Sequence, residues 1–123
     1  MAERPAGKKQ PYAIVSADGK PFAMAGLWEN WKEPQSGETV RTFTIITGQP
    51  NELVAPIHNR MPVILPPSHW RAWLGDEPVP AEELQPLLQP YPADLMRAYP
   101  VDMRVGNVRN NDAALIEPVA LAL

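Results

Sequence analysis

Sixteen prolines among 123 residues constrain this chain more than any other feature of its sequence. Proline fixes φ and lacks a backbone N–H, so it interrupts helices and is excluded from central strands. Short helices, short strands and many loops of fixed shape are therefore expected. Hydrophobic residues make up 45% of the chain and charged residues 20%, which is typical of a chain with a folded core.

The strand signals lie mainly in three segments. Residues 12–27 have the form of a hairpin that turns at Asp18-Gly19, because glycine accepts the positive φ of a tight turn. Residues 39–47 are rich in β-branched side chains and predict a strand buried on both faces towards its C-terminal end. Residues 101–108 alternate apolar and polar side chains, which predicts a half-buried strand.

The helix signals are short. Residues 69–75 follow Ser68, a good N-cap, and end at Gly75, while residues 81–88 carry leucines on one face. Asn51 is expected to cap one helical turn before Pro56. Together these patterns predict an α+β protein, mainly β, with about five or six strands and two or three short helices.

Composition excludes several classes of protein. The chain has no cysteine, which rules out a disulfide scaffold, a thiolate metal site and a cysteine nucleophile within it. A net charge of −3 means that any contact with nucleic acid has to come from a local patch. No apolar run approaches a signal peptide or the roughly 20 residues of a membrane span. We expect a soluble cytoplasmic protein with no membrane partner.

The segment PIHNRMP, residues 56–62, places a histidine and an arginine between two prolines. His58 and His69 stand too far apart for a recognisable ligand pair, so no metal site and no cofactor are expected. No glycine-flanked serine elbow supports a hydrolase triad either. From the residues alone, His58 is a loop histidine satisfied by the backbone or, less favoured, a proton-transfer group. For Arg60, a surface cation or a hydrogen-bond donor that braces the loop is as favoured as a fork of donors for an anionic substrate such as a phosphodiester.

Four tryptophans form two pairs with a spacing of three, Trp28 with Trp31 and Trp70 with Trp73. If both segments are helical, each pair lies on one face. Exposed aromatic side chains can stack on unpaired bases. The favoured interpretation is that the four side chains anchor short elements to the core.

Six segments, in this order and spacing, resemble the SOS-response-associated peptidase (SRAP) family over residues 8–119: KKQPYAI, PFAMAGLWENW, FTIIT, PIHNRMPVILPP, YPV and VGNVRNNDAALIEPV. The H-x-R-M-P element is the most specific of them. The resemblance implies a mostly β, barrel-like α+β fold with a cleft for single-stranded DNA. It also implies that the partner is single-stranded DNA containing abasic sites.

The chemistry that the resemblance implies begins at an N-terminal cysteine, which crosslinks to the opened abasic sugar as a thiazolidine and also has autopeptidase activity. A glutamate and a histidine handle the protons. His58 matches that histidine, Arg60 matches an arginine that holds a DNA phosphate, and Thr47 closes FTIIT where the family has a threonine near the site. The cysteine, an asparagine and the glutamate have no counterpart here. Whether this chain is itself an enzyme therefore stays uncertain, and we expect it to be inactive alone.

The matched elements correspond to the C-terminal half of the family domain. We therefore expect an incomplete SRAP-like barrel, with residues 1–11 as a flexible arm and residues 12–120 as the C-terminal part of a single domain. Either the true coding start lies upstream or the gene is split or degenerate. An unpaired strand edge, at residues 12–16 or 42–47, would favour self-association. The alternative function is a noncatalytic remnant that binds single-stranded DNA or a protein partner.

Overall fold

The structure is a computed structural model that describes residues 2–3 and 9–121, in two compact units. The first unit contains Met1–Pro21, Pro50–Arg60 and Pro92–Leu123, and the second contains Phe22–Gln49 and Met61–Tyr91. The chain therefore passes back and forth between the units, and each is described by itself.

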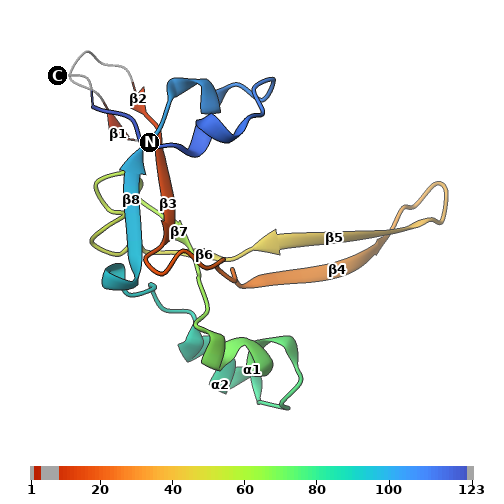
Figure 1. Cartoon of the computed structure of the whole chain (residues 1–123). Helices are drawn as coiled ribbons and strands as arrows, with labels where there is room; N and C mark the ends of the chain where they lie inside the picture. The colour runs from red at the N-terminus through yellow and green to blue at the C-terminus, as the bar shows by residue number, and fades with distance from the viewer. Residues whose placement is uncertain (1, 4–8, 122–123) are drawn as a thin grey trace. The chain divides into compact units, whose positions relative to one another are not determined.

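The main sheet of the first unit pairs two strands that are far apart in sequence. Strand β3 (Tyr12–Ser16) runs antiparallel to β8 (Met96–Pro100), side by side in Figure 1. The expected turn forms after β3, where Gly19 has φ of 78° and its N–H donates to the Ser16 carbonyl over 3.0 Å. The hairpin expected for residues 12–27 is wrong, because β8 occupies the position beside β3 that the returning strand would have taken.

Strands β1 (Ala2–Glu3) and β2 (Lys9–Gln10) form a second, shorter antiparallel pair. Gln10 is buried, and its side-chain amide donates to the carbonyl oxygens of Pro11 and Val101 over 3.1 and 2.8 Å. The bond to Val101 connects the N-terminal part of the unit to the residues that follow β8. The arm expected at residues 1–11 remains a prediction, since residues 1 and 4–8 lie outside the described part of the chain.

Beyond β8 the chain forms single turns of 3₁₀ helix at η4 (Met103–Gly106) and η5 (Ala113–Ile116). The strand expected at residues 101–108 is therefore wrong. Val101 is buried, as the alternation suggested, but Asp102 accepts a hydrogen bond from the Arg104 N–H over 2.8 Å and caps a helical turn instead. A short polar side chain bonded to its neighbouring backbone competes with strand pairing.

The second unit contains a long hairpin of β4 (Gly26–Lys32) and β5 (Thr39–Ile45), which extends from the rest of its unit in Figure 1. At its tip, the Glu33 carboxylate accepts hydrogen bonds from the backbone N–H groups of Ser36 and Gln35, which lower its pKa, the Ser36 bond most. Gly37 completes the turn with φ of 73°.

The expectation for this hairpin was wrong in two respects. Trp28 and Trp31 have the spacing of one helix face, yet β4 runs through Trp28 to Lys32, so both side chains lie on a strand. Residues 39–47 were expected to be buried on both faces towards the C-terminal end, but all residues of β5 are exposed. The β-branched residues correctly predicted that β5 is a strand. Its burial was not observed, because no other described element covers its faces.

The core of the second unit forms where the hairpin meets the rest of the unit. Ala25, Val63 and Leu65 are buried there, and the side chains packed against them are Ile46, Trp73, Leu87 and Leu88. The backbone holds the same place together, since the Ala25 N–H donates to Val63 and the Ile46 N–H donates to Ala25. Strands β6 (Thr47–Gly48) and β7 (Met61–Pro62) pair beside it.

The helices of this unit are short, as the prolines predicted. They are η1 (Pro67–His69), α1 (Trp70–Leu74), α2 (Ala81–Leu84) and η2 (Gln85–Leu87). Gly75 ends α1 with φ of 84°, as expected, whereas Ser68 lies inside η1 and does not cap α1. The indole N–H groups of Trp70 and Trp73 donate to the carbonyls of Leu65 and Gly26 over 2.8 and 3.1 Å, so this pair does anchor the helix.

The fold class is confirmed at the level of composition: the structure is mixed α and β with mainly strands. The described strands form two-stranded sheets and no closed barrel. In the described residues, no helix has the length and apolar character needed to cross a membrane.

Candidate functional site

The segment that leads to His58 is organised by Asn51, which is buried in the first unit. Its side-chain oxygen accepts hydrogen bonds from the N–H groups of Leu53 and Val54 over 3.1 and 3.0 Å, and its amide donates to the sulfur of Met96 over 3.3 Å. Asn51 therefore caps the turn, as its sequence position predicted. The bond to Met96 also connects the turn to β8.

Val54 connects this turn to the histidine. Its side chain is buried, and its carbonyl accepts hydrogen bonds from the backbone N–H groups of Ile57 and His58 over 2.8 and 2.9 Å. Pro56 lies within the same turn and fixes its own φ. The backbone of His58 is thus positioned by a buried asparagine seven residues earlier in the chain, a connection that the sequence interpretation did not make.

The imidazole of His58 is held by the backbone of Arg60. Its Nδ1 atom lies 3.1 Å from the Arg60 backbone nitrogen and 3.1 Å from the Arg60 carbonyl oxygen. When Nδ1 is unprotonated it accepts from the N–H, and when it is protonated it donates to the carbonyl. Either tautomer keeps one bond to Arg60, so the ring stays in place while the proton changes nitrogen.

This arrangement leaves Nε2 as the atom that can exchange a proton with a substrate. Nε2 has no hydrogen-bond partner within the described chain, and His58, Asn59 and Arg60 are all exposed. In one tautomer Nε2 is a donor and in the other an acceptor. An exposed ring fixed at one nitrogen and open at the other has the geometry that general acid–base chemistry requires.

Arg60 and Thr47 complete the residues that the sequence singled out. Arg60 ends the Pro50–Arg60 segment of the first unit and directly precedes β7. Thr47 opens β6 in the second unit, where its partner across the ladder is Pro62. The described geometry joins His58 to Arg60, and it places Thr47 on the strand that pairs with the residues after Arg60. The site assignment of all three residues remains a prediction.

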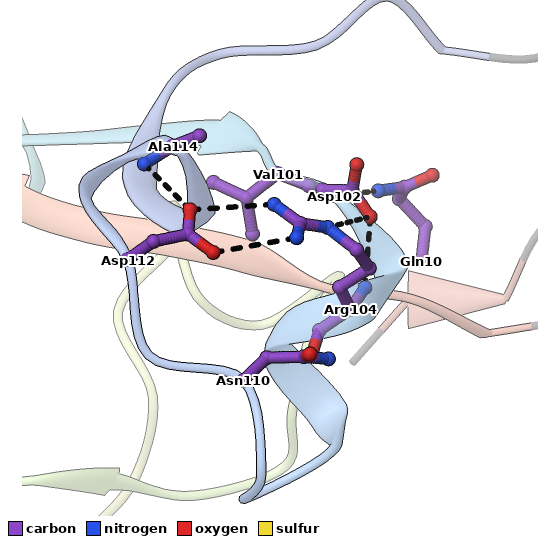
Figure 2. A network of polar contacts seen from close by, with 7 residues as sticks. All are labelled: Gln10, Val101, Asp102, Arg104, Asn110, Asp112 and Ala114. Carbon is purple, nitrogen blue, oxygen red and sulfur yellow. Dashed lines mark hydrogen bonds and ion pairs between the residues drawn. The ribbon is translucent and has the colours of Figure 1, made fainter.

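The last matched segment, residues 105–119, is held by a polar network in the first unit (Figure 2). The Arg104 guanidinium donates to both carboxylate oxygens of Asp112 over 3.3 Å each, and the Asn110 amide donates to the Arg104 carbonyl over 2.8 Å. Asp112 also accepts from the Ala114 N–H over 3.0 Å. A planar guanidinium that binds a carboxylate through two bonds fixes direction as well as distance. Sequence interpretation missed this pair, because nothing local joins residues eight positions apart.

The two histidines of the chain lie in different units. Within the described residues, no three histidine, aspartate or glutamate side chains are grouped so that they could hold a metal ion. His69 lies at the end of η1 in the second unit, where its Nδ1 is buried without a hydrogen-bond partner among the described residues.

The sequence of this chain was compared with models of known protein families. The family model described as SOS response associated peptidase (SRAP) matches residues 2–108. The chain belongs to the SRAP family. The resemblance read from the six segments is therefore confirmed, and the SRAP match spans the turn, the histidine loop and the hairpin alike.

Two curated SRAP relatives share much of this sequence. The chain is 46% identical over 109 residues to "Abasic site processing protein YoqW" of Bacillus subtilis (strain 168), covering 89% of this chain and 48% of the relative. It is 35% identical over 114 residues to "Abasic site processing protein YedK" of Escherichia coli (strain K12), covering 91% and 50%.

A solved structure extends the SRAP comparison to the fold. A protein from Bacteroides thetaiotaomicron superimposes with a TM-score of 0.85 at 30% identity, over 97% of this chain and 52% of that one. The chain thus spans about half the length of the curated relatives and of the solved structure that it matches.

Proposed function

We propose that this chain supplies the proton-transfer and phosphate-binding half of a site that processes abasic positions in single-stranded DNA. The observation that carries the proposal is the imidazole of His58, anchored at Nδ1 by the Arg60 backbone and open at Nε2, in a chain whose relatives are named abasic site processing proteins. The nucleophile, an N-terminal cysteine, comes from the part of the domain that this chain lacks.

In this proposal His58 transfers a proton during opening of the abasic sugar. The closed sugar has a hydroxyl on the reactive carbon, and opening it removes that proton and delivers one to the ring oxygen. An acceptor Nε2 takes the first proton, and the ring, then protonated at both nitrogens, keeps its bond to the Arg60 carbonyl. Nε2 then returns a proton to the ring oxygen, which leaves a free aldehyde and restores the starting imidazole.

The aldehyde then reacts with groups from outside this chain. The α-amine of the cysteine adds to the aldehyde carbon, one water leaves, and the thiol adds to the resulting imine to close a thiazolidine ring. Arg60 holds a flanking phosphate, and Thr47 binds nearby DNA, because a guanidinium fork and a hydroxyl are suited to phosphate oxygens. The chain alone has no cysteine and therefore forms no such adduct.

An adduct assay tests this proposal. The chain is incubated with an abasic single-stranded oligonucleotide, alone and joined to the part of YoqW that lies outside its match to this chain, and products are resolved on a denaturing gel. We expect no adduct from the chain alone and a stable adduct from the joined protein. His58→Gln should slow adduct formation about 100-fold, whereas the matched variant His69→Gln should not. An adduct formed by this chain alone would contradict the proposal.

The second candidate is a noncatalytic remnant that binds single-stranded DNA or a protein partner. The exposed apolar side chains of β4 and β5 favour its protein-binding form, because they offer a surface for a polypeptide without chemistry. Weak DNA binding that falls with added salt and with Arg60→Ala would support the DNA form, since phosphate contacts release counterions. Binding that is indifferent to salt would support a protein partner.

The remaining expectations belong to the same proposal. Residues 12–120 form the C-terminal part of one SRAP domain, and the incomplete barrel leaves a strand edge through which the isolated chain self-associates. The protein acts in the cytoplasm, where it is associated with DNA. Sedimentation of the chain alone measures the self-association directly.

A further inference from the structure

The hairpin of the second unit exposes large apolar side chains along most of its length. Phe43 is 79% exposed and Trp28 is 66% exposed, and the other apolar side chains of β4 and β5 that are exposed in the same way are Leu27, Trp31, Val40 and Ile45. These six residues are called the hairpin surface below. Single exposed apolar side chains are common on proteins, but larger groups of them mark interaction sites.

Both faces of the hairpin are apolar. The register places Trp28 opposite Phe43, and three residues further along β4 it places Trp31 opposite Val40. Because successive side chains of a strand alternate between faces, these two pairs lie on opposite faces of the hairpin. A hairpin with water on one side would be polar on that side. Two apolar faces are typical of strands covered on both sides.

The apolar area continues beyond the strands at the base of the hairpin. A hollow of about 260 Å³ is lined there by residues of β4 together with Trp73, Leu74 and Leu84. Leu74 is 73% exposed although it ends helix α1. The hairpin surface therefore joins a concave site on its own unit, which a packed chain segment could fill.

The charges of the hairpin argue against DNA as the occupant. Glu29, Glu33 and Glu38 outnumber the cations Lys32 and Arg41 between Gly26 and Ile45. The Arg41 guanidinium also lies 5.1 Å from the centre of the Trp28 ring, and its Nε donates to the Asn30 side chain over 3.3 Å. Phosphate binding requires a positive field, so the hairpin surface suits a polypeptide better.

The solved relative indicates which polypeptide this is. Its superposition covers 97% of this chain, a share that has to include most of the hairpin, yet only 52% of the relative is used. A chain that retains this hairpin thus carries almost as much polypeptide again. We propose that the hairpin surface is the docking site for the other half of the SRAP domain, whether that half is on the same polypeptide or on a separate one.

This inference rests on the part of the proposed function in which a second half completes the domain, and its test uses no abasic DNA. The probe is the YoqW remainder, the part of YoqW outside its match to this chain, joined ahead of this chain or added as a separate chain. Amide hydrogen exchange is measured for residues 26–45. We expect exchange at least about tenfold slower in the joined protein than in this chain alone, because covered strands open less often.

Two variants make the test specific to the hairpin surface. Phe43→Thr removes the most exposed aromatic side chain and keeps a residue that favours strands, so it should weaken association of the separate chains about tenfold or more. Val108→Thr is the matched control, because Val108 is 98% exposed but belongs to the first unit. It should leave association unchanged.

Several results would overturn the inference. Unchanged exchange in the joined protein, or equal effects of Phe43→Thr and Val108→Thr, would show that the other half binds elsewhere. Protection of residues 26–45 in a dimer of this chain would assign the hairpin surface to a second copy. Protection only after addition of an undamaged oligonucleotide would assign it to DNA. The exchange measurement and the separate adduct assay with abasic DNA distinguish the two proposals. Protection of the hairpin with no adduct would reject the proposed function and leave this inference standing. An adduct with no protection of the hairpin would reject this inference and leave the proposed function standing.

Discussion

The Nδ1 atom of His58 lies 3.1 Å from both the backbone nitrogen and the carbonyl oxygen of Arg60. One ring atom thus has a donor and an acceptor available on the same residue. The ring keeps an anchor in either tautomer, which makes its position independent of where the proton resides. This relationship depends on the turn that delivers His58, and that turn depends on Asn51.

Replacing Asn51 should loosen this turn. Asn51→Ala leaves the N–H groups of Leu53 and Val54 without their acceptor in a buried place, so the free energy of unfolding should fall by about 1–3 kcal/mol. Asn51→Asp should restore part of the loss, because a carboxylate also accepts from these N–H groups. Chemical denaturation measures the change. Asn59→Ala, at an exposed position of the same loop, should change stability by less than about 0.5 kcal/mol, and an equal loss would contradict the capping role.

Asp18 should make stability depend on pH in acid. Its pKa is lowered by the hydrogen bond from the Ser16 hydroxyl, 2.6 Å away, and by the bond from the Lys20 N–H. A depressed folded-state pKa stabilises the fold above the ordinary aspartate value of about 3.9, and the contribution is lost as the pH falls through the folded pKa. Ser16→Ala should raise the pKa of Asp18 in a carboxyl NMR titration, and an unchanged titration would remove Ser16 as the cause.

A double-mutant cycle should detect the coupling between Arg104 and Asp112. Both side chains are nearly half exposed, so the interaction should contribute no more than about 1 kcal/mol to the free energy of unfolding. Arg104→Lys should lose most of it, because an ammonium does not reproduce the two parallel bonds. Thermal unfolding of Arg104→Lys, Asp112→Asn and the double variant gives the coupling energy. Additive losses would mean that Arg104 and Asp112, both drawn in Figure 2, are not energetically coupled.

Local chemistry was predictable along much of this chain. Gly19 and Gly75 adopt the positive φ expected of a turn and of a helix end, and Asn51 caps its turn. These features depend on a few neighbouring residues, so their residue types are sufficient evidence. The H-x-R-M-P element was likewise sufficient to indicate the family, because its residue types and their order are the evidence.

Pairing over long distances in sequence was not predictable in this way. Residues 12–27 contain a turn and two apolar runs, which predicts a hairpin, yet β3 pairs with β8 about eighty residues later. Nothing within β3 distinguishes the two partners, because a strand offers the same backbone groups to either. Similarly, Trp28 and Trp31 have a helical spacing, and pairing of β4 with β5 placed them on opposite faces of a strand.

The sequence alone thus determined that the elements are short, that the chain turns at Gly19 and ends a helix at Gly75, that Asn51 caps its turn, and that the chain belongs to the SRAP family. Each of these depends on residue types that stand close together or recur in a fixed order. Only the tertiary structure decided which strands pair, that the Arg60 backbone holds the imidazole of His58 in both tautomers, and that both faces of the hairpin are exposed. These properties depend on which groups meet in space, and burial of a strand depends on the polypeptide that packs against it.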